Sequence, residues 1–369
     1  MKFIFPNKKR EVEMAKRIER LASLITERCC EVKPGDKVYL ITNHPSAQPL
    51  YQAVREMIIK KGAFVLDHFV YEDYLDVYFT SRSFLKNASD EQLSILPESK
   101  IEELKSSNAM VWIEAFPDPF QFSVGPERIS KWAKTLGPMS GEYLQKKYVM
   151  TFFPTEDYAK WTKVPLKKLR EIYYAACFVD REKLEEKMEK VKEIFDNASL
   201  VQIKGKGTDL SFSLQEMAGC LENGKENLPG GEVYYAPLKD SLEGFISFTY
   251  PGVHFGKEMK NIRLEFKKGK IVSASAKENQ ETLEKIINTD EGARYIGEFG
   301  IGCNSGVEKW TGELFLDEVI NGTIHLAIGD SYKECGGDNR SAVHFDIVTD
   351  VRKRNKVFAD GKEVKLLSK

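Results

Sequence analysis

The spacing of apolar residues changes near residue 197, and this change most restricts the folds open to the chain. Before it, segments of helical periodicity alternate with short apolar runs: Glu11–Cys30 and Ala47–Lys61 are typical of amphipathic helices, Val38–Thr42 and Phe64–Val70 of strands. A strand, a crossover helix and a second strand predict a parallel, right-handed unit. We therefore expect residues 1–196 to form an α/β domain with an open, largely parallel sheet.

After residue 197 the chain consists mainly of short β-prone runs broken by glycine and aspartate. Two hairpin turns can be placed, at Lys268-Gly269 and at Asp360-Gly361. A chain of 369 residues also exceeds the roughly 250–300 residues that one core serves. We expect a second, mostly β domain of α+β class over residues 197–369, with the charged helix Arg181–Asp196 connecting the halves.

Charge and cysteine content exclude several classes of partner. Lys and Arg total 55 against 56 Asp and Glu, so a broad basic surface for nucleic acid or an acidic membrane is not expected. No run approaches the roughly 18 apolar residues that cross a bilayer, and the first residues lack the apolar core of a signal peptide. Six cysteines without a CxxC pair favour a reducing compartment. We expect a cytoplasmic protein that binds neither nucleic acid nor membranes.

Histidines close to acids suggest a metal site in the second half. His344 and Asp346 are two residues apart in a β-prone run, so a strand would point both side chains to one side. His325 lies in the strand-like segment GTIHLAIG, where burial would require a partner. Each feature alone has a more ordinary explanation: a hydrogen-bonded pair on a solvated strand, and a satisfied core histidine.

Acidic residues near glycines extend this set. Glu232 follows a Gly-Gly pair, Glu298 lies between Gly297 and Gly300, and Glu318 lies in the segment LFLDEVINGT. Taken singly, Glu232 is more often a solvated residue at the start of a strand, and Glu318 could be a ligand, a base or an exposed loop acid. Together with the histidines and Asp346 they form a set of N and O ligands within residues 232–346 that would suit two divalent ions sharing a carboxylate, provided they converge in space.

Four blocks of this half carry a family resemblance. GEVYYAP at 231–237, DEGARYIGE at 290–298, LDEVINGTIHLAIGDSY at 316–332 and NRSAVHFD at 339–346 occur in the order found in the aminopeptidase T family of two-metal exopeptidases, which the chain resembles. The likeness extends more faintly to FFPTEDYAKW at 152–161 in the first half. The loop between Tyr332 and His344 and the spacing around Glu318 differ from the family pattern, which affects substrate fit more than metal chemistry.

The resemblance implies a homodimeric metal-dependent aminopeptidase that removes amino-terminal residues from peptides with a water activated by two divalent ions, Zn, Co or Mn. It assigns the metal ligands as Glu232, Glu298, His325, His344 and Asp346, with Glu298 as the bridge. Tyr332 matches the active-site tyrosine of the family and Glu318 a further family acid with a catalytic role.

Two alternative functions stay open. A nucleotide-using α/β enzyme would need a phosphate-binding loop, and the only weak candidate is the Gly205-x-Gly207 segment, which is more typical of a turn. A noncatalytic binding protein could use the same metal ligands only to stabilise the β domain, and its ions would have no open coordination position.

Overall fold

The computed structural model describes residues 8–69, 74–75, 80–116, 124, 126–254, 256–353 and 355–366. The chain divides into two compact units: Met1–Tyr174 with Gly224–Leu228, and Ala175–Asn223 with Pro229–Lys369. The boundary expected at residue 196 falls inside the second unit. Residues 1–7, whose composition argued against a signal peptide, lie outside the described residues.

The first unit contains a five-stranded sheet in which every neighbouring pair is parallel, in the order β10-β6-β5-β1-β2. Its strands are β1 (Lys37–Thr42), β2 (Phe64–His68), β5 (Ala109–Glu114), β6 (Lys147–Phe152) and β10 (Asn227–Leu228). β1 and β5 are almost wholly buried, as expected for central strands covered on both faces. The open parallel sheet predicted from sequence is confirmed, and β10 extends it with residues from far along the chain.

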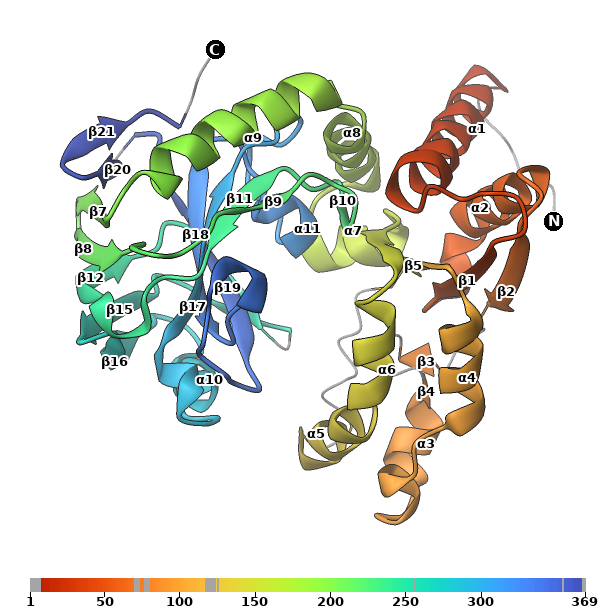
Figure 1. Ribbon diagram of the computed structural model, residues 1–369, viewed down its shortest axis with the longest axis horizontal. Helices are drawn as coiled ribbons and strands as arrows, with labels where there is room; N and C mark the ends of the chain where they lie inside the picture. Colours follow the sequence, from red (N-terminus) through yellow and green to blue (C-terminus); the bar gives the residue numbers. More distant parts are fainter. Residues whose placement is uncertain are drawn as a thin grey trace. The chain divides into compact units, whose positions relative to one another are not determined.

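Helices of the first unit follow its strands in the expected alternation (Figure 1). They are α1 (Lys8–Ser23), α2 (Gln48–Lys60), α3 (Arg82–Asn87), α4 (Glu98–Ser106), α5 (Pro126–Thr135), α6 (Gly137–Tyr143) and α7 (Glu156–Thr162). α1 continues as a π-helical turn to Cys29, and α8 (Leu166–Cys177) leads into the second unit. The strands β3 (Tyr74–Leu75) and β4 (Thr80–Ser81) form a small ribbon. Among the described helices, none is both long and apolar enough to cross a bilayer.

The second unit is mostly β, as predicted, and packs two antiparallel sheets around one core. A seven-stranded sheet runs in the order β16-β15-β12-β8-β7-β20-β21, formed by β7 (Leu200–Gly205), β8 (Thr208–Ser213), β12 (Glu243–Ser247), β15 (Arg263–Lys267), β16 (Lys270–Ser275), β20 (Asn355–Ala359) and β21 (Lys362–Val364). Both predicted hairpins are present, and Lys268, Gly269, Asp360 and Gly361 all have positive φ, as a type I′ turn requires.

A five-stranded sheet in the order β19-β18-β17-β11-β9 completes this unit. It contains β9 (Cys220–Glu222), β11 (Glu232–Tyr235), β17 (Ile296–Gly302), β18 (Thr323–Gly329) and β19 (His344–Asp350). The strands β13 (Gly252–His254) and β14 (Lys257–Met259) form a separate ribbon. The helices of this unit are α9 (Arg181–Asp196), α10 (Gln280–Ile287) and α11 (Leu314–Asp317). α9 packs into the core of this unit through Leu184, Met188, Val191 and Phe195, so it belongs to the second unit and is not a separate connecting helix.

Side-chain alternation gives the five-stranded sheet two different faces. One set of alternate residues, including Phe299, Ile301, Leu326 and Ile347, joins the apolar core together with α9. The intervening residues of the same strands, among them Glu298, His325 and Asp346, point to the opposite face. We call this second surface the polar face; β17 and β18 are nevertheless buried along their whole length.

Candidate metal centre

The polar face brings together all five residues for which the sequence predicts a ligand role. Glu232 begins β11, Glu298 lies in β17, His325 in β18, and His344 and Asp346 in β19, so the residues come from four neighbouring strands. Strand pairing aligns them: Ala327 of β18 is opposite both Glu298 and Asp346. Because paired residues share a face, and residues two apart on a strand do as well, the five side chains project to one side.

The side chains converge around Glu298. Nε2 of His325 lies 3.2 Å from Oε1 of Glu298 and 3.3 Å from Oε2 of Glu232. Nε2 of His344 lies 3.2 Å from the other oxygen of Glu298, Oε2, and 3.6 Å from Oδ2 of Asp346. Two groups of ligand atoms therefore form, each with its atoms within 4.8 Å of one another: Glu232, Glu298 and His325, and Glu298, His344 and Asp346. Glu298 belongs to both.

Unsatisfied polar atoms show that the site fits metal ions. Among the described residues, Oδ1 of Asp346 and Nδ1 of His325 are buried without a hydrogen-bond partner, and Oε2 of Glu232 has only its ion-pair contact with His325 and no hydrogen bond. Buried polar groups are normally hydrogen-bonded. Nδ1 of His344 lies 3.0 Å from the carbonyl oxygen of Asp330. When Nδ1–H donates to that carbonyl, Nε2 keeps its lone pair for a metal, which is the usual arrangement of a ligating histidine. Oxygen and imidazole ligands suit Zn, Co or Mn.

Electrostatics in the metal-free site depend on the same contacts. Burial lowers the pKa of His325, but its hydrogen bond to Glu298 and the charges of nearby carboxylates outweigh burial and raise the pKa to about 9. The pKa of His344 rises to about 10 because Asp346 and Glu298 outweigh its burial. Burial raises the pKa of Glu232, whereas both imidazoles lower the pKa of Glu298 in spite of its burial. In the absence of metal, protons on the imidazoles supply part of the positive charge that the acids require.

A glycine makes room for one of the imidazoles. Gly300 of β17 pairs with His325 of β18. A Cβ atom at Gly300 would overlap Nε2 and Cε1 of the His325 ring. The imidazole therefore lies against bare backbone, and the missing side chain lets it reach Glu298 and Glu232.

Tyr332 and Glu318 come from turns beside the sheet. Tyr332 follows β18 and precedes a 3-10 turn, Lys333–Cys335; its hydroxyl lies 3.5 Å from Nε2 of His344, and the residue is 39% exposed. Its ring packs edge-on against Tyr234, with ring centroids 5.2 Å apart. Glu318 ends α11, and burial raises its pKa well above the usual range, with further contributions from Glu232 and Asp346. Both residues thus lie beside the polar face, and a catalytic role for them stays a prediction.

Sequence reasoning missed one acid, Glu222. It lies in β9 directly opposite Glu232 and is only 6% exposed. Its charge contributes to raising the pKa of both Glu232 and Glu318. β9 has only three residues, which is too short to show the alternation that would have pointed to Glu222.

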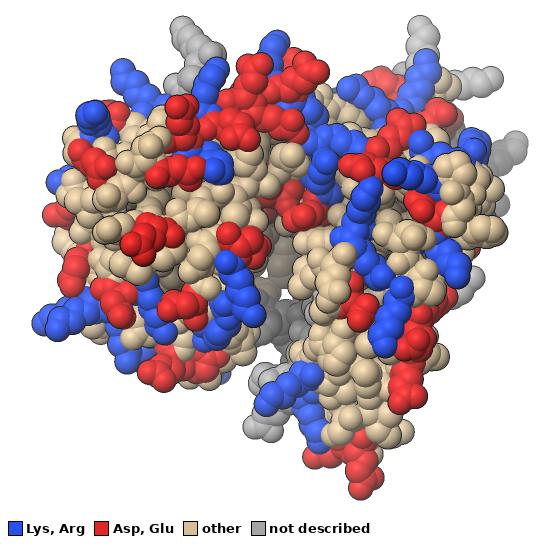
Figure 2. All heavy atoms as spheres, in the orientation of Figure 1, with Lys and Arg blue, Asp and Glu red and all other residues tan. Residues whose placement is uncertain are grey.

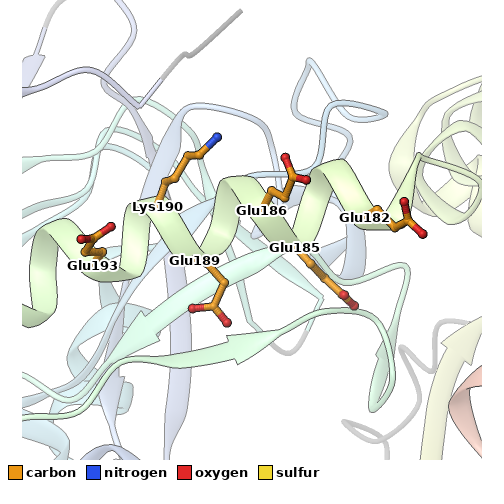
Figure 3. Close-up of a pocket in the computed structure, with 6 residues that line it drawn as sticks. All are labelled: Glu182, Glu185, Glu186, Glu189, Lys190 and Glu193. Atoms are coloured by element: carbon orange, nitrogen blue, oxygen red, sulfur yellow. The ribbon is translucent and has the colours of Figure 1, made fainter.

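A second acidic cluster lies elsewhere in the same unit. Acidic side chains gather over α9 (Figure 2), and a surface groove there is lined by Glu182, Glu185, Glu186, Glu189, Lys190 and Glu193. Figure 3 shows that these side chains leave the helix in different directions, so they do not converge on one point. Since α9 packs on the apolar side of the core, this groove is a solvated helix surface distinct from the polar face.

Comparison with known proteins agrees with the geometry. The family model of the M29 peptidases, described as thermophilic metalloprotease (M29), matches residues 14–369. Aminopeptidase AmpS of Bacillus subtilis is 30% identical over 206 residues, which are 48% of this chain and 50% of that protein. Aminopeptidase 2 of Geobacillus stearothermophilus is 24% identical over 354 residues, covering 86% of this chain and 84% of that protein.

Two solved structures share the fold. AmpT from Thermus thermophilus superposes with a TM-score of 0.77 at 22% identity, covering 95% of this chain and 97% of that one. A 2,5-dihydroxypyridine dioxygenase from Pseudomonas putida has a TM-score of 0.61 at 16% identity, covering 97% and 96%. At these identities the structures establish the fold, and the chemistry has to be argued from the site.

We predict that Gly300→Ala weakens metal binding about 10–100-fold, because the added methyl group displaces the His325 ring from its carboxylate partners. This loss of affinity can be measured by calorimetric titration of Zn²⁺ or Mn²⁺ into protein from which metal has been removed with a chelator. Gly141→Ala is the control, since a Cβ at Gly141 meets no atom within 4 Å. If the Gly300 variant bound metal as tightly as the unmodified protein, the proposal that His325 is a metal ligand packed against Gly300 would be wrong.

We also predict that protein treated with a chelator to remove metal becomes less stable to unfolding as pH rises from about 6.5 to 10. The pKa values of His325 and His344 are raised to about 9 and about 10, so their stabilising contribution is complete below the unfolded value of about 6.5 and is lost as pH rises through the folded values. Ionisation of Glu232, whose pKa is raised by burial, acts in the same direction. Thermal melts with chelator should fall over this range more steeply than melts with saturating metal; parallel curves would contradict the assignment.

Proposed function

Since the chain belongs to the M29 family of metalloproteases, we propose that it is an aminopeptidase that uses two divalent metal ions to remove amino-terminal residues from peptides. One observation carries the proposal: each carboxylate oxygen of Glu298 faces a different histidine, and each histidine has a further acid beside it. This is the ligand arrangement that two ions sharing one carboxylate would need. The names of the relatives, AmpS and aminopeptidase 2, support the exopeptidase assignment.

The five proposed ligands, Glu232, Glu298, His325, His344 and Asp346, sit on paired strands of a rigid sheet whose other face is packed in the core. Two divalent ions held there would supply a water of lowered pKa and positive charge beside the scissile carbonyl. The strands fix the ligands before substrate arrives, so little reorganisation accompanies the reaction. Zn, Co and Mn all suit this ligand set, and the proposal covers each of them.

Tyr332 and Glu318 are proposed to act on the substrate itself. The Tyr332 hydroxyl lies close to His344 on a partly exposed residue. After a small reorientation it would donate a hydrogen bond to the carbonyl oxygen of the substrate as that oxygen gains negative charge. Burial raises the pKa of Glu318 well above its usual range, which favours the protonated acid, and that proton could pass to the departing amine. Binding of the free α-amine near the acids of the polar face would restrict cleavage to the amino-terminal residue.

The alternative functions are less well supported. Gly205 ends β7 and Gly207, with φ of +76°, turns the chain into β8, so the Gly-x-Gly segment is a hairpin turn and not a phosphate-binding loop. The partly exposed Tyr332 beside the ligands favours a site that substrate can reach over ions enclosed for structure alone. The homodimer that the resemblance implies stays a prediction, as does the cytoplasmic location.

We predict that chelator-treated protein has no peptidase activity and that adding back Zn²⁺, Co²⁺ or Mn²⁺ restores it on peptides with a free amino terminus. The same peptides with an acetylated amino terminus should remain uncleaved, since acetylation removes the charge and the lone pair of the α-amine. Product analysis by mass spectrometry measures both. Equal cleavage of free and acetylated peptides would refute the exopeptidase proposal.

For Tyr332→Phe we predict a fall in kcat of about 10²–10³-fold, the usual effect of removing one donor to a developing oxyanion, with metal affinity unchanged. Tyr250→Phe is the matched control: it also removes a tyrosine hydroxyl from the second unit, but that hydroxyl contacts Asp350 and Arg352 and no proposed ligand. Steady-state kinetics together with metal titration separate the two effects. A normal kcat would remove Tyr332 from the mechanism.

A further inference from the structure

Two cysteines from distant parts of the second unit meet beside the turn that carries Tyr332. Cys220 begins β9 and Cys335 ends the 3-10 turn Lys333–Cys335. Their sulfur atoms are 2.9 Å apart, although 115 residues separate them in sequence. Both are free thiols. The distance is less than 1 Å longer than a disulfide bond of about 2.05 Å, so a small movement would join them.

The two segments that carry these thiols already pack together. The backbone N–H of Ala218 donates a hydrogen bond to the carbonyl oxygen of Cys335, and the Cys335 thiol also lies 3.9 Å from the carbonyl oxygen of Tyr234. A Cβ at Gly336 would lie 3.2 Å from Sδ of Met217, so the turn and the loop before β9 are in close contact there. These contacts hold the two segments next to each other, so the thiols stay within reach of one another.

The two thiols differ in the properties that decide their roles. Cys220 is partly exposed, whereas Cys335 is fully buried. The hydrogen bond from Cys335 lowers the pKa of Cys220 despite partial burial, and the charge of Lys192 acts in the same direction. Since the thiolate is the attacking species in thiol–disulfide exchange, Cys220 is suited to react first and Cys335 to react second.

We propose that Cys220 and Cys335 form a redox-active dithiol that low-molecular-weight disulfides, such as oxidised glutathione, convert to a disulfide within the second unit. The Cys220 thiolate attacks one sulfur of the reagent, forms a mixed disulfide and releases one thiolate. The Cys335 thiol, on losing its proton to solvent, attacks Sγ of Cys220 and releases the second thiolate. Two protein thiols are thereby oxidised and one disulfide is reduced to two thiols.

The disulfide would tie the Tyr332 turn to the sheet. Tyr332 lies three residues before Cys335, and the N–H of Gly337 donates to its carbonyl oxygen, closing the turn between them. Its hydroxyl is 3.5 Å from His344, so it must move or reorient to donate to a substrate. A covalent link to β9 restricts that movement. This consequence rests on the proposed function, whereas the dithiol itself does not.

Chemical mapping of the full-length protein tests the dithiol. Reduced protein incubated with oxidised glutathione should lose two alkylatable thiols and yield one crosslinked peptide pair containing Cys220 and Cys335. Its melting temperature should rise by roughly 5–15 °C, since the link closes a long loop. Cys177→Ala, which removes a buried cysteine of the same unit, should behave like wild type.

Single substitutions of the pair provide the decisive comparison. Cys335→Ser should accumulate a stable glutathione adduct on Cys220, because the second thiol is missing. Cys220→Ser should accumulate little adduct, because Cys335 is buried. An oxidised protein that keeps all six thiols alkylatable, or that crosslinks other cysteines, would overturn the dithiol proposal.

Peptide hydrolysis tests the consequence for Tyr332. Oxidation should lower kcat by about threefold or more, reduction should restore it, and Cys220→Ser should be insensitive to oxidant. A crosslinked protein with unchanged kcat would overturn the link to Tyr332. Reduced, metal-loaded protein without any peptidase activity would instead refute the proposed function, and the mass and melting measurements would still decide the dithiol.

Discussion

The buried carboxylate of Glu298, held between two imidazoles, is the interaction on which the rest of the site depends. Three acids on one sheet face, almost closed off from water, repel one another and lose hydration, and such a group is stable only with compensating positive charge. His325 and His344 supply part of that charge through the two oxygens of Glu298. Glu222 and Glu318 add further acids nearby, so the cluster carries more potential negative charge than two imidazolium groups can balance, which favours divalent cations.

The five-stranded sheet holds this group in place. Alternation lets each strand contribute apolar side chains to the core and polar ones to the opposite face, so the packing that stabilises the unit also fixes the ligands. Gly300 shows how tightly the two functions are linked: its missing side chain is what permits the His325 ring to cross β17. The geometry of the ligands therefore depends on strand register. A shift of register by one residue would move the ligands of that strand to the other face of the sheet.

Sequence reasoning predicted what local periodicity encodes and missed what register and distant pairing decide. The parallel sheet, the β-rich second unit and the two hairpins follow from patterns within a few residues. His344 and Asp346 could be placed on one side of a strand for the same reason, but the convergence of Glu232 and Glu298 on His325 came from a family resemblance. Three features depend on tertiary structure, and no local signal marks them: β10, which pairs with β6 residues 77 positions away, Glu222 on a three-residue strand, and the Cys220–Cys335 contact.

The division between strands and turns also explains how one fold can serve different reactions. A dioxygenase shares this architecture, so the sheets alone do not specify hydrolysis. The proposed ligands lie on strands that the core fixes, whereas Tyr332 and Glu318 lie outside the strands, next to a 3-10 turn and at the end of α11. Such connecting segments vary more readily than the strands they join. Chemistry and substrate choice can therefore diverge through those segments while the ligand framework is kept. The Cys220–Cys335 contact joins the turn after Tyr332 to β9. It therefore acts on one of the segments through which substrate choice can change.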